Sequence, residues 1–306
     1  MQALIESITP VATDVVEIVL APVDTPFEHY SPGSHVDFFL PGIGARQYSL
    51  TGDGVVYRFM IQRENQGRGG STFIHSSLQC GDLIEVSQPR NTFPLKRGKP
   101  LLFIAGGIGI TPFLSMMQAL DESEFGLLYF CRERARVVDD PRLTQLEKTG
   151  VATISLGLSP ELTLASIERK IESYAGDLRV YCCGPKALNT SVQSICAHRS
   201  GVEFYSESFA PLEQDISSPS SGFHVVLKKR GGRVYVPPEK SILEAIRDSG
   251  VDLQSSCESG LCGTCKVSYE SGRVDHRDLV LSDEERKTTI LVCCSRSLSD
   301  ELVLEI

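Results

Sequence analysis

The sequence predicts a multidomain protein with three regions in series: an antiparallel β region, an alternating α/β region and a small region built around cysteines. Residues 1 to about 97 carry short runs rich in branched and aromatic residues, separated by proline and glycine, as in a small barrel or sandwich. Residues 101–207 alternate strand-like and helical segments, which indicates a parallel sheet with helices on both faces. A C-x4-C-x2-C spacing follows near the C-terminus. The chain of 306 residues has room for two or three such domains.

Composition and charge exclude several classes of protein. Hydrophobic residues make up 41% of the chain and there is no long low-complexity tract, so we expect a globular protein throughout. The net charge of −9 argues against a nucleic-acid partner. The longest apolar run, residues 101–110, is interrupted by three glycines and is too short to cross a membrane. Because the N-terminus lacks the pattern of a signal peptide, we expect a cytoplasmic protein with reduced cysteines.

Two stretches of the β region are candidate binding sites. Its strand-like segments are residues 15–20, 35–40 and 55–62. RQYSL (46–50) stands at the expected start of a further strand, and GRGGS (67–71) opens a short helical stretch at 72–78. Glycines at a helix N-terminus expose unpaired N–H groups and the positive end of the helix dipole, which suits a phosphate. The alternative is a hairpin loop that runs into a surface helix.

The α/β region places a glycine run at its first strand-to-helix turn. Strand-like segments are residues 101–105, 126–131, 152–156 and 179–182, and the clearest helix is 185–198. GGIGITP (106–112) follows the first strand, at the turn where parallel sheets of this kind bind the pyrophosphate of a dinucleotide. Because the run is not G-x-G-x-x-G, it is weak evidence by itself.

The C-terminal region begins after a linker. Residues 210–222 (APLEQDISSPSSG) are rich in proline, serine and glycine and have no apolar periodicity, so we interpret them as a linker. We then expect a hairpin at 223–227 and 233–236, an amphipathic helix at 241–249 and a closing strand at 301–306.

Four cysteines of this region have the spacing of a plant-type 2Fe–2S site. Cys257, Cys262 and Cys265 form C-x4-C-x2-C, and Cys293 follows after 27 intervening residues; in such a site four thiolates hold two irons and two sulfides. A structural zinc site and a disulfide pair are the alternatives. Zinc sites usually pair C-x2-C with a second C-x2-C or with histidines, and this region has no such second half.

Taken together, these motifs resemble those of the phthalate dioxygenase reductase family, the reductase components of Rieske-type aromatic oxygenases. The resemblance covers the whole chain and rests on eight motifs in the family's order: RQYSL (46–50), GRGGS (67–71), PRNTFPL (89–95), GGIGITP (106–112), YCCGP (181–185), ESF (207–209), SCESGLCGTC (256–265) and DHRDLVL (275–281). It implies an FMN-binding antiparallel β-barrel at 1–99, a doubly wound α/β domain for NADH at 100–209, the linker at 210–222 and a β-grasp plant-type ferredoxin at 223–306.

The resemblance implies a reductase that passes electrons from NADH through FMN to the 2Fe–2S cluster and on to a Rieske-type oxygenase component. NADH gives up a hydride pair and the cluster accepts single electrons, so a flavin has to stand between them. The same cofactors in a reductase for a separate ferredoxin or a small molecule are one alternative, and a redox sensor is another. We expect a monomer that binds neither nucleic acid nor membrane.

The resemblance also implies roles for individual residues. In the flavin site, Arg46 pairs with the FMN phosphate, Tyr48 packs along the flavin and Ser49 hydrogen-bonds near its reactive nitrogen. The remaining cofactor contacts implied in the β region are Gln47, Gly69, Gly70 and Ser71.

In the α/β region, the resemblance implies that Gly107, Gly109 and Thr111 border the dinucleotide. Cys183, with Gly184 and Pro185, lies near the nicotinamide. The residues expected to act in the reaction itself are Ser49, Cys183, Glu207 and Phe209, the last two matching the family's acid and the aromatic residue that covers the flavin.

Three interpretations depend on choices between neighbouring residues. In the doublets Cys182-Cys183 and Cys293-Cys294, we assign Cys183 because it adjoins Gly-Pro, and Cys293 because the family's fourth ligand precedes x-Ser-Arg. At the adenosine ribose, Glu133 favours NADH, whereas Arg132 and Arg134 suit the 2′-phosphate of NADPH; we follow the family and expect NADH.

Glu258, in the cysteine loop, is a candidate charge for docking of the partner.

Overall fold

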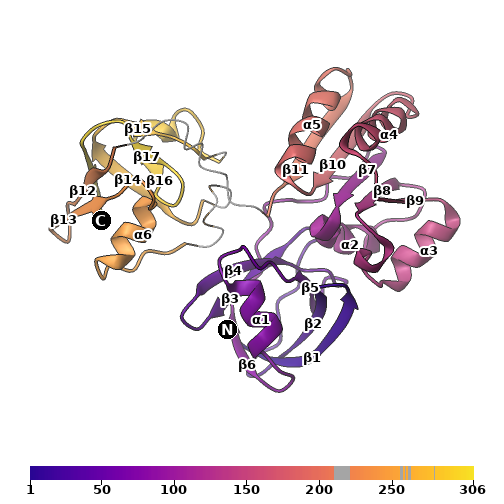
Figure 1. Ribbon diagram of the computed structural model, residues 1–306, viewed down its shortest axis with the longest axis horizontal. Helices are drawn as coiled ribbons and strands as arrows, with labels where there is room; N and C mark the ends of the chain where they lie inside the picture. The colour runs from indigo at the N-terminus through magenta and orange to yellow at the C-terminus, as the bar shows by residue number, and fades with distance from the viewer. Residues whose placement is uncertain (210–220, 256–257, 259, 261–262, 279) are drawn as a thin grey trace. The chain divides into compact units, whose positions relative to one another are not determined.

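The computed structural model describes residues 1–209, 221–255, 258, 260, 263–278 and 280–306. The chain divides into two compact units, Met1–Phe209 and Ala210–Ile306. Figure 1 labels the helices and strands of both units. Among the described residues, no helix combines the length and apolar character that a bilayer crossing requires; the cytoplasmic location stays a prediction.

The first unit opens with an antiparallel barrel capped by one helix. Its strands, in the sheet order β4-β3-β6-β1-β2-β5, are β1 (Gln2–Ala12), β2 (Val15–Pro22), β3 (His35–Leu40), β4 (Gly44–Ser49), β5 (Tyr57–Gln62) and β6 (Leu83–Val86), with helix α1 (Gly70–Ser77). The Thr51 N–H donates to the Arg58 carbonyl over 2.8 Å, which brings the chain beyond β4 against β5 and curls the sheet on itself. The predicted antiparallel region is therefore confirmed.

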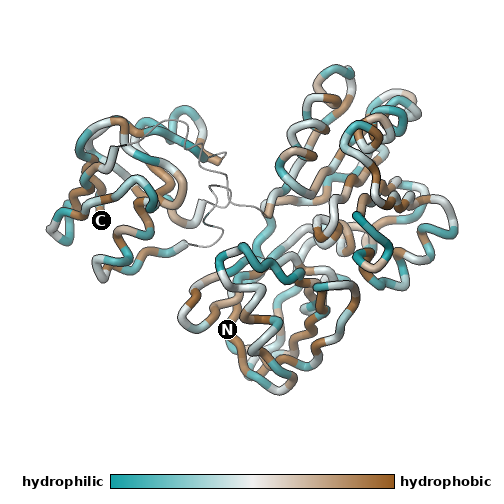
Figure 2. The backbone as a smooth tube through the Cα atoms, viewed as in Figure 1, coloured by the Kyte–Doolittle hydropathy of each residue, from teal (hydrophilic) through white to brown (hydrophobic). Residues whose placement is uncertain are grey.

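Alternation of side chains along the barrel strands gives it a closed core. In β5, Tyr57, Phe59 and Ile61 have no more than 1% exposure, because every second residue of a strand points to the same face. Figure 2 shows brown, hydrophobic stretches along the strands of the barrel. The sequence did not predict β1: Pro10 lies inside it, and its pairing with β2 shifts register between Ile5 and Ser7, so its hydrophobic pattern is interrupted.

The second half of the same unit is a parallel sheet with helices on both faces (Figure 1). Its strands, in the order β11-β10-β7-β8-β9, are β7 (Leu101–Gly106), β8 (Phe125–Cys131), β9 (Ala152–Leu156), β10 (Leu178–Cys183) and β11 (Val202–Glu207). The helical elements are η1 (Gly107–Ile110), α2 (Thr111–Gln118), η2 (Arg134–Arg136), α3 (Pro141–Thr149), α4 (Pro160–Glu172) and α5 (Lys186–Ala197). The predicted doubly wound arrangement is confirmed.

The central strand β7 explains the apolar run seen in the sequence. Residues 101–105 all have 1% exposure or less, because both faces of a parallel sheet are covered. Phe103 packs in the cluster with Phe113 of α2, while Leu102 packs in the cluster with Val192 of α5. The chain order reverses between β7 and β10, and sheets of this type bind ligands beyond the carboxyl ends of the strands at such a switch point.

The second unit is a mixed sheet with one helix packed on it. Its five-stranded sheet has the order β13-β12-β18-β14-β16. The elements are β12 (Phe223–Leu227), β13 (Arg233–Val236), α6 (Ile242–Asp248), β14 (Lys266–Ser271), β15 (Val274–Asp275), η3 (Glu285–Lys287), β16 (Thr289–Leu291), β17 (Arg296–Ser297) and β18 (Glu301–Leu304). A capping box of Ser241 and Glu244 starts α6, and Ile246 of this helix is buried against Val225 and Leu302 of the sheet.

Candidate functional site

The start of helix α1 forms an anion site in the barrel. Its N-cap residue, Gly69, has a left-handed backbone (φ +80°) and no side-chain oxygen caps the helix, so the first N–H groups and the positive dipole end face outward. A Cβ at Gly70 would lie 2.5 Å from Arg46 Cγ. Only glycine at this position therefore leaves room for the Arg46 side chain beside the helix start. Ser71 Oγ accepts from the Glu64 N–H over 2.9 Å, which fixes the preceding loop.

Arg46 is held so that its guanidinium lies by this helix start. It donates to the Ala45 carbonyl over 2.7 Å and to the Arg68 carbonyl over 2.8 Å. A guanidinium beside uncapped helix N–H groups has the donors and the charge that a phosphate needs. The residues present fit the phosphate end of a flavin mononucleotide.

The residues after Arg46 lie on alternating faces of β4. Tyr48 contacts Phe38 edge to face with ring centroids 5.1 Å apart, and burial raises the pKa of its phenol to about 12, so it stays neutral. Gln47 and Ser49 pair across the ladder with Asp37 and His35. The stretch RQYS stands at the end of its strand, not at the start as the sequence suggested, because β4 already begins at Gly44.

Two glycine-bearing loops pack against each other at the switch point of the parallel sheet. A Cβ at Gly109 would lie 2.1 Å from the Cys183 carbonyl oxygen, and one at Gly106 would lie 2.9 Å from Pro185 Cδ. A Cβ at Gly184 would lie 3.1 Å from Gly106 Cα. These contacts explain why both GGIG and CGP carry glycine: the loops after β7 and β10 approach too closely for side chains.

Two other residues of the predicted dinucleotide border have different local roles. Gly107 has a left-handed backbone (φ +55°), which glycine adopts at little cost. Thr111 is 3% exposed, and its hydroxyl donates to the Ile108 carbonyl over 3.1 Å. Thr111 therefore stabilises the turn into α2 by a hydrogen bond within the protein.

Cys183 and Glu207 end neighbouring strands and pair directly in the parallel ladder. The Cys183 thiol is fully buried, and burial raises its pKa above the ordinary value. Glu207 has a buried Oε2 atom with no hydrogen-bond partner, and burial raises the pKa of its carboxyl to about 8. Glu207 is therefore mostly protonated at neutral pH, so the edge of the sheet carries a neutral acid.

The end of β11 is held by a residue that sequence reasoning missed. The Asn189 side chain on α5 donates from Nδ2 to the Glu207 carbonyl over 2.8 Å. The signal in the sequence was a polar residue on the buried face of an otherwise amphipathic helix. Phe209, two residues beyond Glu207, is 45% exposed, so it is not a core residue. Cys182 packs on the opposite side of the sheet.

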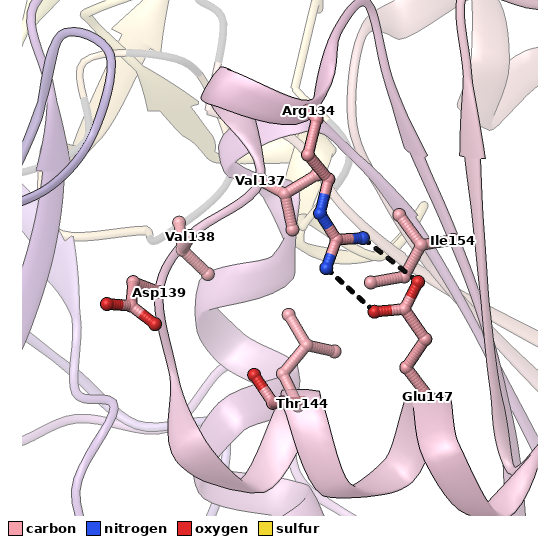
Figure 3. A pocket seen from close by; sticks show the side chains of 8 residues that line it. Arg134, Val137, Val138, Asp139, Thr144, Glu147 and Ile154 are labelled. Carbon is pink, nitrogen blue, oxygen red and sulfur yellow. Dashed lines mark hydrogen bonds and ion pairs between the residues drawn. The ribbon is translucent and has the colours of Figure 1, made fainter.

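The charged residues after β8 are largely paired within the protein. Glu133 accepts from Arg136 over 3.2 Å. Arg134 makes two 2.9 Å hydrogen bonds to Glu147 and holds the pKa of that carboxyl below its ordinary value. Figure 3 shows this pair beside a cavity of about 110 Å³, which is smaller than the ~300 Å³ of typical ligand pockets. Arg132 is exposed.

A third loop reaches the same edge of the sheet and was not assigned from the sequence. The Gly157 N–H donates to the Cys131 carbonyl over 2.9 Å, and a Cβ at Gly157 would lie 3.4 Å from the Arg132 carbonyl oxygen. Ser159 then caps α4 by accepting from the Leu162 N–H. The glycine just before a serine-capped helix was the available signal.

Two of the four predicted cluster ligands are described. Cys265 and Cys293 are 4% and 6% exposed, and their side chains lie within hydrogen-bonding reach of each other. The Val292 N–H donates to the Cys265 carbonyl over 3.3 Å, and the Leu243 N–H donates to the Val292 carbonyl over 2.9 Å. Two buried thiols in contact match the donor set of an iron–sulfur cluster. Cys257 and Cys262 lie outside the described residues.

Glu258 does not have the environment expected of a docking charge. Its carboxylate pairs with Arg247 over 2.6 Å and accepts from the Ser255 hydroxyl over 2.8 Å, and its side chain is only 15% exposed. The sequence could not show this, because Arg247 stands at the end of a helix eleven residues earlier. The pair ties α6 to the cysteine loop.

The chain is similar to known redox proteins over its full length. The model of the 2Fe–2S iron-sulfur cluster binding domain matches residues 226–298. Phthalate dioxygenase reductase from Burkholderia cepacia is 37% identical over 292 residues, which are 93% of this chain and 90% of that protein. Tetrachlorobenzoquinone reductase from Sphingobium chlorophenolicum is 34% identical, covering 99% of this chain and 97% of its own length.

Among solved structures, phthalate dioxygenase reductase matches with a TM-score of 0.78 and 36% identity, covering 100% of this chain and 98% of that one. That structure is described as a modular one for electron transfer from pyridine nucleotides to [2Fe-2S].

Proposed function

Because this chain belongs to the phthalate dioxygenase reductase family, we propose that it takes electrons from NADH and delivers them one at a time to a Rieske-type oxygenase. FMN and a 2Fe–2S cluster are its cofactors. The observation that carries the proposal is that one chain holds three separate sites: an uncapped helix start beside Arg46, a glycine-lined switch point and a pair of buried thiols.

In the barrel, the protein binds the phosphate of FMN and orients its ring. Arg46 and the first N–H groups of α1 hold the phosphate, with Ser71 fixing the loop beside it. Tyr48 offers a neutral ring surface next to that site, and Gln47 and Ser49 complete the strand end. A bound flavin supplies the exchange between a hydride and single electrons.

At the switch point, the protein positions NADH. Hydride transfer needs no general base, so the work of the site is orientation. The close packing of Gly109 against the Cys183 carbonyl shapes the surface on which the nicotinamide half rests. Protonated Glu207 adds no negative charge beside the ring, and exposed Phe209 shields the place where the ring enters.

At the adenosine end, we propose a preference for NADH. Arg134 is neutralised by Glu147, which removes one of the two charges that suit a 2′-phosphate. Glu133 is 60% exposed and held by Arg136, so its carboxylate remains at the surface to accept from a ribose hydroxyl. Arg132 is the other arginine that suits a 2′-phosphate. If Arg132 binds that phosphate, the protein would not prefer NADH over NADPH.

In the second unit, Cys257, Cys262, Cys265 and Cys293 would hold the 2Fe–2S cluster. The cluster supplies single-electron exchange with the partner. The protein keeps the two described thiols, Cys265 and Cys293, out of water and joins their segments through the backbone of Val292. We propose that the protein acts as a monomer.

A second acceptor class has a specific observation in its favour. One relative of almost equal length is a tetrachlorobenzoquinone reductase, so a quinone is the alternative to an oxygenase. A quinone accepts electrons directly from a reduced flavin, whereas delivery to an oxygenase requires the cluster. Cys265→Ser separates the two: it should stop oxygenase-coupled turnover while NADH-driven quinone reduction continues.

The proposed function is tested by turnover of a Rieske-type oxygenase with this protein and NADH. Product formation should require NADH, the protein and the oxygenase together, and it should stop in Cys265→Ser. Product at the full rate with Cys265→Ser would show that electrons bypass the cluster, which contradicts the proposal.

A further inference from the structure

Among the residues that the structure describes, Arg296 has the largest fully buried side chain. It is 1% exposed and lies on β17, three residues after Cys293. Its guanidinium donates to the Lys240 carbonyl over 2.7 Å and to the Pro237 carbonyl over 3.2 Å, and it lies 5.1 Å from the centre of the Phe223 ring. All of these partners are uncharged groups.

The charge of Arg296 has no ion-pair partner within 4.0 Å among the residues that the structure describes. Asp275 lies opposite it in the β15–β17 ladder, but that carboxylate pairs with Arg277 over 2.7 Å. Glu239 is exposed to solvent. A buried charge without a partner destabilises the folded protein, so a nearby anion that only the loaded protein contains would offset this destabilisation.

Arg296 belongs to the segment that carries a cluster ligand. Its hydrogen bonds fix residues 237–240, the turn just before the N-cap of α6. The first turn of α6 bonds to the Val292 carbonyl, and the Val292 N–H bonds to the Cys265 carbonyl. The guanidinium is therefore held by the same backbone network that positions Cys265 and Cys293.

We propose that Arg296 is a fixed positive charge that favours the reduced form of the 2Fe–2S cluster, an inference that rests on the proposed function. Four thiolates and two sulfides make the cluster negative, and reduction adds one more negative charge. Net charge and solvent exposure set the potentials of such clusters, and a charge inside a protein is screened much less than one at the surface. Arg296 acts through its field, and the electron still comes from NADH.

The test is a redox titration of the cluster in the full-length protein, followed by electron paramagnetic resonance. In Arg296→Met, the ratio of reduced to oxidised cluster at the wild-type midpoint should fall about tenfold, or about 59 mV for one electron. Arg296→Lys keeps the charge and should stay within about threefold of the wild type. Arg233→Gln removes an exposed charge of the same unit, paired with Glu301, and should leave the midpoint unchanged.

An intact cluster with an unshifted midpoint in Arg296→Met would overturn the proposal and leave Arg296 a purely structural residue. If Arg296→Met takes up no cluster, Arg296→Gln is titrated instead, with the same expected fall. If only Arg296→Lys takes up the cluster, the positive charge is required. If none of the three variants takes up the cluster, Arg296 acts through the hydrogen bonds of its guanidinium, and the proposal is overturned. A wild-type protein without any cluster signal would contradict the proposed function itself.

Discussion

Replacing Glu207 with glutamine should stabilise the first unit, and increasingly so as the pH rises. Burial raises the pKa of Glu207 from 4.5 to about 8 in the folded protein, so the unfolded chain loses this proton at a lower pH than the folded chain does. Below about pH 4.5 the carboxyl is protonated in both the folded and the unfolded chain, and the folded protein has its full stability. This stability is lost as the pH rises towards 8. Glutamine does not titrate, so the Glu207→Gln variant does not lose stability in this way as the pH rises.

The expected magnitude follows from the shift. Each pKa unit corresponds to about 1.36 kcal/mol, so a shift of about 3.5 units (8 minus 4.5) costs at most roughly 5 kcal/mol above pH 8. Between pH 5 and pH 9, the difference in unfolding free energy between Glu207→Gln and wild type should grow by about 4 kcal/mol. For a unit of this size that is roughly 10 °C in the melting temperature.

Thermal unfolding at pH 5, 7 and 9 measures this difference. Glu172→Gln, which changes an exposed acid at the end of α4, is the control and should follow wild type at every pH. Parallel curves for Glu207→Gln and wild type would show that Glu207 is ionised in the folded protein at neutral pH. That result would refute the assignment of a neutral acid beside Cys183.

Three further predictions concern the other sites. Gly109→Ala should lower kcat/KM for NADH by about 100-fold with the cluster content unchanged, because a Cβ would lie 2.1 Å from the carbonyl oxygen of the facing loop; a normal steady-state rate would contradict this. Cys293→Ser should abolish the cluster absorbance and Cys294→Ser should retain it; the reverse would mean that the doublet was wrongly assigned. Steady-state kcat/KM should favour NADH over NADPH by about tenfold, or ~1.4 kcal/mol, and Glu133→Ala should reduce that ratio, whereas equal rates in the wild type would assign the site to Arg132.

The sequence predicted those parts of the fold that depend on local pattern. The alternation of strand-like and helical segments in residues 101–207 predicted a parallel sheet, which the structure confirms. The glycine run after β7 was predicted to form the first strand-to-helix turn, where the structure brings two loops into contact. The cysteine spacing likewise predicted a cluster domain, which the matching domain model confirms. β1 escaped prediction because Pro10 and a register shift interrupt its pattern.

The contacts between distant residues could not be predicted from the sequence. The pairing of Glu258 with Arg247 and the bond from Asn189 to the Glu207 carbonyl depend on how helices meet loops. The burial that shifts the pKa of Glu207 is also a property of the packed sheet edge. Sequence reasoning could therefore name Glu207 as a site residue but not state its protonation.

The central claim, that electrons from NADH reach the cluster, is tested most directly by electron paramagnetic resonance of the anaerobic protein after addition of NADH. The wild type should show the signal of a reduced 2Fe–2S cluster. Cys293→Ser should show none, although NADH still bleaches its flavin absorbance. A wild-type protein that contains the cluster, and whose flavin is bleached by NADH without any cluster signal, would contradict the account.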